Sequence, residues 1–165
     1  MQWRDHASPI AAGDVFFEKR HLAAFAALIV NALPVWRRNA LAAGHAMEAL
    51  CGQIVAGPAS YILVPERARS RDGKIHAFKS GIGALVAGTD VPVLPCHITG
   101  AAAAAPIGAH FPRRHKITLR IGRPLHFQSV RDNRAGWDEI AAVTQNAVAR
   151  LAASDSGLTP PPRRP

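Results

Sequence analysis

The residues best suited to chemistry follow a short apolar run in the first half of the chain. That run is Tyr61–Val64, bounded by Pro58 and Pro65, a pattern typical of a buried strand. The following loop, Glu66 to Ile75, carries four cations: Arg67, Arg69, Arg71 and Lys74. Arginine suits phosphate, because its planar guanidinium donates two parallel hydrogen bonds to one pair of oxygens.

The place of this basic loop directly after a strand favours a ligand site. In open α/β sheets, ligands bind beyond the carboxyl ends of the strands. We therefore predict a phosphate site at one mouth of a sheet, in which Glu66 stays ionised and orients one of the cations. A solvated surface loop with ordinary ion pairs is the commoner explanation of such a charge run taken alone, so the residues alone leave both open.

The elements that position this loop follow from apolar periodicity. Runs of apolar or alternating residues predict four strands, at Ile10–Phe17, Tyr61–Val64, Val91–Ile98 and Lys116–Ile121. Helical spacing predicts four helices, at His21–Ala32, Leu41–Val55, Phe78–Val86 and Trp137–Leu151. Asn39 is the expected N-cap of the second helix. Strands alternating with helices indicate an α/β domain with a mixed central sheet flanked by helices.

Two of the predicted strands are expected to depart from a regular buried strand. Pro92 and Pro95 make the third strand irregular or an edge, because proline lacks the N–H that a sheet needs. Lys116–Ile121 alternates polar and apolar residues, as a half-exposed strand should. Residues 35–38 are expected to be a loop and residues 101–109 an alanine-rich connector.

The composition limits the classes of molecule that this chain is expected to bind. The 165 residues carry a formal net charge of +9, which favours partners with phosphate or carboxylate groups, such as nucleic acid, anionic lipid headgroups or a polyanionic cofactor. Nucleic acid is the weakest of these, because no predicted helix carries a basic stripe and no strand pairs aromatic residues with arginine. The apolar run Leu22–Trp36 is interrupted by Asn31 and Pro34 and is shorter than the roughly 20 residues of a membrane span.

Cysteine and histidine give no further site. Cys51 and Cys96 form no disulfide framework, lie in apolar stretches and are expected in the core of a protein from a reducing cytosol. The eight histidines have no Cys/His spacing suited to zinc. His97 is expected to be packed or half-exposed at a strand end, and His76, His110, His115 and His126 to be solvated.

The stretch Leu63–Gly81 resembles the third signature block of the lysophosphatidic acid acyltransferase family. There a strand ends in Phe-Pro-Glu-Gly-Thr-Arg-Ser, followed by a Gly-Lys turn and Phe-Lys-x-Gly. Eight residues fall in register: Pro65, Glu66, Arg69, Ser70, Gly73, Phe78, Lys79 and Gly81. Three further stretches resemble other conserved segments of the family in the expected order: Asn31–Arg37, Val91–Pro95 and Ile121–Pro124.

The resemblance implies a function and a site. Members of this family transfer an acyl chain from acyl-CoA or acyl-carrier protein to a lysophospholipid hydroxyl, with no metal or redox cofactor. By position in the blocks, Arg37, Glu66, Arg67, Arg69 and Ser70 would bind the phosphate of the acceptor. The apolar helix expected from Leu22 and the basic surface would suit a peripheral protein on the anionic inner face of the cytoplasmic membrane. The domain would occupy residues 1–153, and the Pro/Arg-rich residues 154–165 are expected to be a disordered tail.

Two departures from the family pattern affect the chemistry. Arg67-Ala68 replaces the Gly-Thr of the third block, which either adds a phosphate contact or obstructs the pocket. The family's general base is the histidine of a His-x4-Asp block, yet no histidine in these 165 residues has an aspartate five positions later. No catalytic residue is therefore assigned.

These departures leave three expectations to compare. The first is an acyltransferase domain whose His-x4-Asp block is encoded in frame upstream of Met1, with an exposed apolar patch or open sheet edge near Ile10–Phe17 and the Leu22 helix. The second is a catalytically inactive relative that binds lipid or phosphate. The third, from another class, is a basic nucleic-acid-binding protein.

Overall fold

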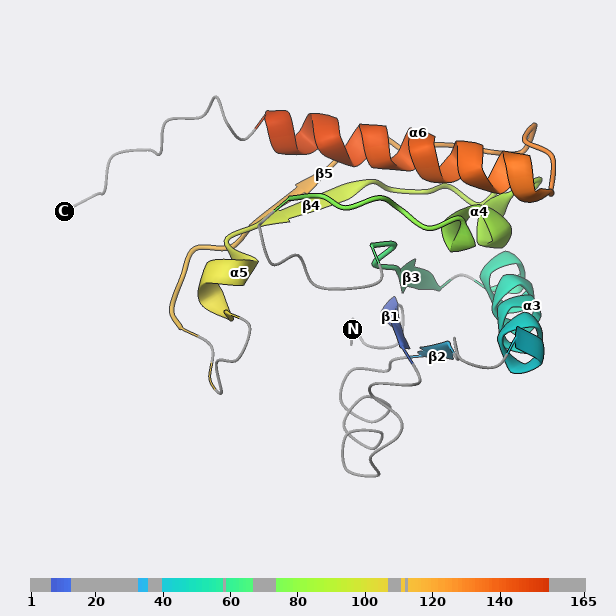
Figure 1. The fold of residues 1–165 in the computed structure, drawn as a ribbon, viewed down its shortest axis with the longest axis horizontal. Helices are drawn as coiled ribbons and strands as arrows, with labels where there is room; N and C mark the ends of the chain where they lie inside the picture. The colour runs from blue at the N-terminus through green and yellow to red at the C-terminus, as the bar shows by residue number, and fades with distance from the viewer. Residues whose placement is uncertain are drawn as a thin grey trace.

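The computed structural model describes residues 7–12, 33–35, 40–57, 59–66, 74–106, 111 and 113–154. Within these ranges strands and helices alternate along the chain, so the α/β class is confirmed (Figure 1). The strands are β1 Ala7–Ala12, β2 Leu33–Val35, β3 Ser60–Ile62, β4 Cys96–Thr99 and β5 Thr118–Ile121. The helices are α3 Ala40–Ala56, α4 Gly81–Val86, α5 Ala101–Ala104 and α6 Arg134–Ala153.

The first three strands form a parallel sheet in the order β2-β1-β3. The register places Ile10 of β1 opposite Leu33 of β2, and Pro9 of β1 opposite Ile62 of β3. β1 is thus the central strand, paired on both sides. For Ala7–Ala12 the expectation of an open edge is wrong, because the described edges of this sheet belong to β2 and β3. Residues 13–17 and the Leu22 helix, where an apolar patch or open edge was also expected, lie outside the described residues.

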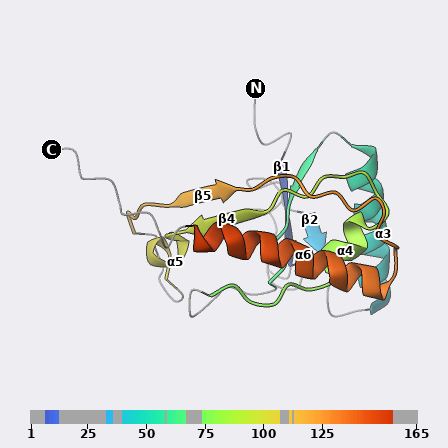
Figure 2. The ribbon, with the colours of Figure 1, turned by 90° about the horizontal axis from the view of Figure 1, so that it is seen from above.

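The last two strands form a separate antiparallel ribbon. Ile98 of β4 lies opposite Leu119 of β5, and Cys96 lies opposite Ile121. Among the described strands no ladder joins this ribbon to the parallel sheet, so parallel and antiparallel pairing are both present but not in one mixed sheet. Figures 1 and 2 show α6 running along one face of the ribbon.

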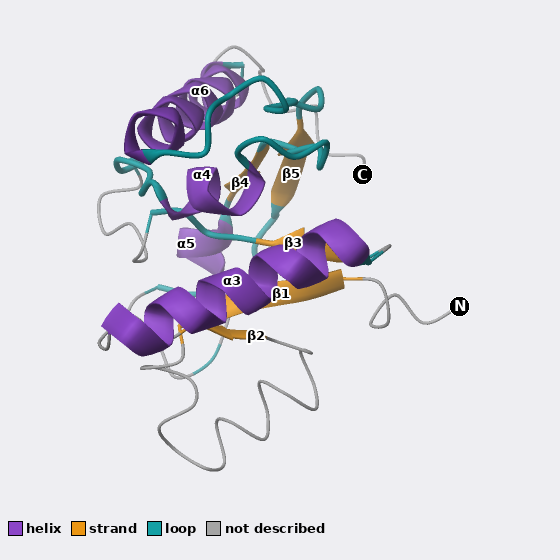
Figure 3. Ribbon diagram, turned by 90° about the vertical axis from the view of Figure 1, so that its right-hand side faces the viewer, coloured by secondary structure: helices purple, strands orange, loops and turns teal. Residues whose placement is uncertain are grey.

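Helix packing builds the core between these sheets. α4 lies between α3 and α6 and packs on both, and α3 extends alongside the parallel sheet (Figure 3). The buried cluster draws on all three helices and on the segment before α6. Its members are Leu50, Ile54, Leu85, Val86, Ala87, Phe127 and Ile140.

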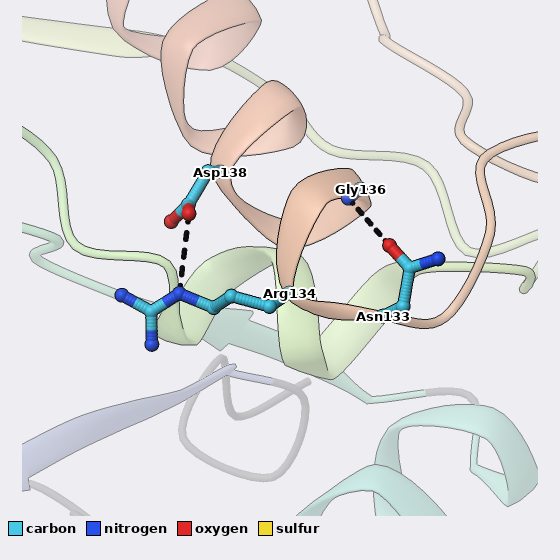
Figure 4. Close-up of polar contacts among 4 residues, drawn as sticks. All are labelled: Asn133, Arg134, Gly136 and Asp138. Atoms are coloured by element: carbon cyan, nitrogen blue, oxygen red, sulfur yellow. Dashed lines mark hydrogen bonds and ion pairs between the residues drawn. The ribbon is translucent and has the colours of Figure 1, made fainter.

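Helix α6 begins at a clear capping signal. Asn133 has an extended backbone, and its side-chain oxygen accepts a hydrogen bond from the Gly136 N–H at 2.9 Å (Figure 4). Arg134 directly follows this cap, and its Nε lies 3.1 Å from Oδ2 of Asp138, an exposed ion pair at the i, i+4 spacing of a helix (Figure 4). The helix therefore starts three residues earlier than its apolar periodicity predicts.

Several predicted boundaries shift for identifiable reasons. Within Val91–Ile98, regular pairing begins only at Cys96, because Pro92 and Pro95 offer no N–H; Val93 forms an isolated bridge with Leu125, with both N–O distances 2.9 Å. Residues 33–35 form a strand although proline lies at their centre, and Ala101–Ala104 form a short helix within the expected connector. The predicted helix His21–Ala32, the Asn39 cap and the tail beyond Ser154 lie outside the described residues.

In the part of the chain that the structure describes, no helix has both the length and the apolar character needed to cross a membrane.

Candidate phosphate-binding site

The basic loop starts at the end of the parallel sheet where the carboxyl ends of its strands lie. β2 and β3 both run parallel to β1, so their carboxyl ends point toward the same edge. From β3 the chain continues through Leu63 and Val64 to a turn at Pro65 and Glu66. Leu63 packs against the hydrophobic core while Val64 is exposed, so the alternation of a strand persists up to this turn.

The carboxylate of Glu66 closes the loop that follows it. Its Oε2 accepts a hydrogen bond from the backbone N–H of His76 at 2.8 Å, across ten residues of chain. A hydrogen bond to a charged acceptor is stronger than one between neutral groups. Glu66 is half-buried, which shields this contact from water in part. The predicted role of Glu66 was to orient a cation, whereas the structure gives its Oε2 a backbone partner.

Two further hydrogen bonds hold the returning chain. The Lys79 N–H donates to the Pro65 carbonyl at 3.1 Å, and the Phe78 N–H donates to Oε1 of Gln145 at 2.9 Å. Gln145 belongs to α6, so the last helix fixes the end of the loop. Sequence reasoning treated this helix as core alone and missed Gln145. Its only signal was a polar residue next to the buried positions of the helix.

Of the five predicted phosphate ligands, the structure describes Glu66 alone. Arg67, Arg69 and Ser70 lie in the loop that Glu66 and Lys79 close, and Arg37 follows β2 by two residues, but these four lie outside the described residues. Lys74 and Lys79 are described and exposed, near the end of the loop. The described geometry therefore fixes the frame of the candidate site, a loop closed at its base on a sheet edge.

The histidines that can be compared with their predictions are structural or solvated. His97 is half-buried on β4, opposite Arg120 of β5, as expected for a packed histidine at a strand. His76, His115 and His126 are exposed. Among the described residues, no group of three or more His, Cys, Asp or Glu side chains could hold a metal ion.

The two cysteines differ in their surroundings. Cys51 is half-buried in α3, and its thiol donates to the Ala84 carbonyl at 3.4 Å. Burial raises the pKa of the Cys51 thiol above its usual value, and the carboxylate of Asp132 raises that pKa further. Cys96 is exposed on β4, so its expected place in the core was wrong.

This contrast predicts selective labelling. Thiolate is the reactive form, so a buried thiol with a raised pKa reacts slowly. We expect iodoacetamide to modify Cys96 at least about tenfold faster than Cys51 near neutral pH, measured by mass spectrometry of peptides over a time course. The Cys96→Ser variant is the control and should take up label only slowly. Equal rates at both cysteines in folded protein would contradict this assignment.

Comparison with known proteins supports a family. The acyltransferase family model matches residues 4–99, which is more than half of the chain. A chloroplastic 1-acyl-sn-glycerol-3-phosphate acyltransferase of Brassica napus is 32% identical over 77 residues, covering 46% of this chain and 22% of the relative. The corresponding enzyme of Limnanthes douglasii is 29% identical over 136 residues, covering 74% of this chain and 48% of the relative. The chain thus spans half or less of these relatives.

A solved structure shares the fold. The crystal structure of the 1-acyl-sn-glycerophosphate acyltransferase PlsC from Thermotoga maritima superposes with a TM-score of 0.61 over 90% of this chain and 57% of that protein. Sequence identity is 21%, so the likeness is one of fold.

Proposed function

Because this chain belongs to the 1-acylglycerol-3-phosphate acyltransferase family, we propose that it forms the acceptor-binding part of an enzyme that acylates lysophosphatidate. In this reaction the acyl C–S bond of a thioester donor breaks and an ester bond forms to the acceptor hydroxyl. The hydroxyl proton passes to a general base and the thiol leaves. The proposed donor is acyl-CoA or acyl-carrier protein, and the reaction needs no metal or redox cofactor.

The observation that carries the proposal is the closed loop on the sheet edge. Glu66 and the 78–79 backbone tie both ends of a segment that contains Arg67, Arg69 and Ser70. Tying the ends reduces the conformational entropy that the loop loses when it binds a ligand. β2 ends toward the same edge, which favours a contribution from Arg37. Convergent guanidinium groups suit the phosphate of lysophosphatidate.

We place the enzyme at the inner face of the cytoplasmic membrane, where its lipid substrate resides. The net charge of +9 favours an anionic leaflet, since each lysine or arginine near the surface adds about 1 kcal/mol of attraction. Residues 1–153 would form the domain, and residues 154–165 would add a basic tail.

A second candidate function is binding without turnover. Two sequence features favour it: Arg67-Ala68 in place of Gly-Thr, and no histidine followed by aspartate at the fifth position. In this alternative the same loop binds a phosphate-bearing lipid, and the acyl donor has no role. The two candidates share their acceptor site and differ in chemistry.

The acceptor site is tested by binding. We expect the 165-residue chain to bind lysophosphatidate, and Arg69→Ala to weaken that binding about tenfold to one hundredfold, because a hydrogen bond to a charged group contributes about 1.5–3 kcal/mol. Isothermal titration below the micelle concentration measures both. Arg163→Ala, in the Pro/Arg-rich tail, is the matched control and should bind like the wild type.

The ligand series separates phosphate recognition from lipid binding. Monoacylglycerol carries the same acyl chain without the phosphate and should bind at least about tenfold more weakly. If Arg69→Ala and Arg163→Ala bind lysophosphatidate equally, or if monoacylglycerol binds as well as lysophosphatidate, the proposed phosphate site is wrong.

A further inference from the structure

The β4–β5 ribbon has an unusual distribution of polarity. Side chains alternate between the two faces of a strand, and cross-strand partners share a face. Ile98, Leu119 and Ile121 lie on one face and are 55%, 55% and 61% exposed. The other face carries His97, Thr99, Thr118 and Arg120, which are only half-exposed. An antiparallel sheet normally turns its apolar face toward the core, and this ribbon does the reverse.

The apolar face extends beyond the paired residues. Leu94 precedes β4 and Ile117 precedes β5, and both side chains are more than half exposed. We define the ribbon patch as Leu94, Cys96, Ile98, Ile117, Leu119 and Ile121. α6 packs against β4 along one side of the ribbon (Figures 1 and 2). A contiguous apolar patch with a polar rim is a common mark of an interaction site.

Basic residues flank the ribbon patch in the sequence, and we call these flanking residues its cationic rim. Residues 91–131 contain no aspartate or glutamate, but they contain six arginine or lysine residues. Arg113 and Arg114 lie just before β5, and Arg123 lies just after it; all three are exposed. The Arg113 N–H donates to the Ala104 carbonyl at 2.6 Å, which fixes the basic segment beside α5. Phe111, 84% exposed, lies next to this segment.

From this combination we propose that the ribbon patch docks on an anionic phospholipid surface. Such a surface offers lipid phosphates to the cationic rim and acyl chains to the apolar centre, so it complements both features at once. The exposed aromatic ring of Phe111, next to the basic segment before β5, suits the headgroup boundary. A second copy of this chain would bring a like-charged rim against the first and offers no carboxylate from residues 91–131 to neutralise it. This inference names the face that meets the membrane in the proposed function, and it needs no turnover.

Vesicle flotation tests the docking face. The 165-residue chain should bind vesicles that contain phosphatidylglycerol, bind pure phosphatidylcholine at least about tenfold more weakly, and lose binding as salt rises. Leu119→Glu combined with Ile121→Glu should weaken binding to the anionic vesicles at least about tenfold. The control is Val55→Glu combined with Val143→Glu, which adds the same charge at exposed apolar positions on α3 and α6 and should retain more binding.

The contribution of the cationic rim is tested with a separate double variant and a matched control. Arg113→Ala combined with Arg114→Ala should weaken binding about tenfold to thirtyfold, from the attraction that each cation near an anionic surface adds. Arg131→Ala combined with Arg150→Ala removes the same charge from exposed positions outside the patch and should have a smaller effect. The patch and rim variants should bind lysophosphatidate like the wild type below the micelle concentration, so the docking face and the acceptor site are tested separately.

The competing occupants give different results. Circular dichroism and thermal unfolding must first show that the variants are folded; if the glutamate pair unfolds the chain, Leu119→Ser combined with Ile121→Ser replaces it. Folded patch variants that bind like their controls would overturn the proposal. A wild-type dimer that becomes monomeric in the Leu119/Ile121 variant would assign the patch to a second copy. If the same patch variants weakened binding to duplex DNA as much as binding to vesicles, the patch would be assigned to nucleic acid.

Discussion

Replacing Gly83 with alanine is expected to lower the free energy of unfolding by about 1–3 kcal/mol, the usual cost of overpacking a buried site. Gly83 is buried in α4 where that helix meets α6. A Cβ built on it would lie less than 3.0 Å from the Cα, carbonyl carbon and oxygen of Trp137. These are backbone atoms and cannot rotate away, so the two helices must separate. Urea unfolding followed by circular dichroism measures the effect.

Gly52 provides a matched control in α3. It is exposed, and a Cβ added there meets nothing within 4 Å. Because glycine in a helix is less stable than alanine by about 0.5–1 kcal/mol, Gly52→Ala should stabilise the domain. The same substitution thus has opposite signs at the two glycines. A Gly83→Ala protein that unfolds at or above the wild-type urea midpoint would show that α4 and α6 are not in close contact.

The Gly83 contact also reaches the candidate site. α6 carries both Trp137, against Gly83, and Gln145, which accepts the Phe78 N–H at the end of the basic loop. Separation of α4 from α6 would move that acceptor away from the loop. Gly83→Ala should therefore weaken lysophosphatidate binding as well as stability, whereas Gly52→Ala should leave binding unchanged.

Local pattern predicted the elements well where one physical effect dominates. The period of α6 identifies this helix, since burial of one helix face leaves a clear trace in sequence. The apolar run identifies a strand at β3, but its expected burial was wrong, because Ile62 and Val64 are 54% and 65% exposed. Boundaries were less accurate: the predicted helix at Phe78 begins at Gly81, and Phe78 lies before it with its N–H donating to Oε1 of Gln145. That contact spans 67 residues of chain, and no local pattern encodes it.

In the candidate site too, residue types were predicted from sequence, whereas contacts between distant residues were not. The block resemblance identified Glu66 by type and place, but its partner is the backbone N–H of His76, a contact that depends on how the loop folds back. The alternation in residues 116–121 correctly indicated a half-exposed strand, while the exposed half proved to be the apolar one. Periodicity gives two faces and does not say which one meets the core, because that depends on what packs above the strand.

The largest expected effect concerns chemistry. The 165-residue chain should release no thiol from acyl-CoA above background in the presence of lysophosphatidate. A general base contributes about 10²–10⁴-fold to such a reaction, and these residues contain no histidine with an aspartate five positions later to orient its imidazole. A family member that carries the His-x4-Asp block, assayed in parallel, is the positive control.

Binding and turnover together test whether these residues carry the chemistry as well as the acceptor site. Lysophosphatidate binding without thiol release is the expected result, and it shows a folded acceptor site that lacks its general base. Thiol release that depends on lysophosphatidate and survives purification away from host enzymes would contradict the prediction. In that case another general base acts in these residues, and the eight histidines are the first candidates. Histidine-to-asparagine variants, beginning with His76 at the closed end of the basic loop, would identify it by a loss of release with binding retained.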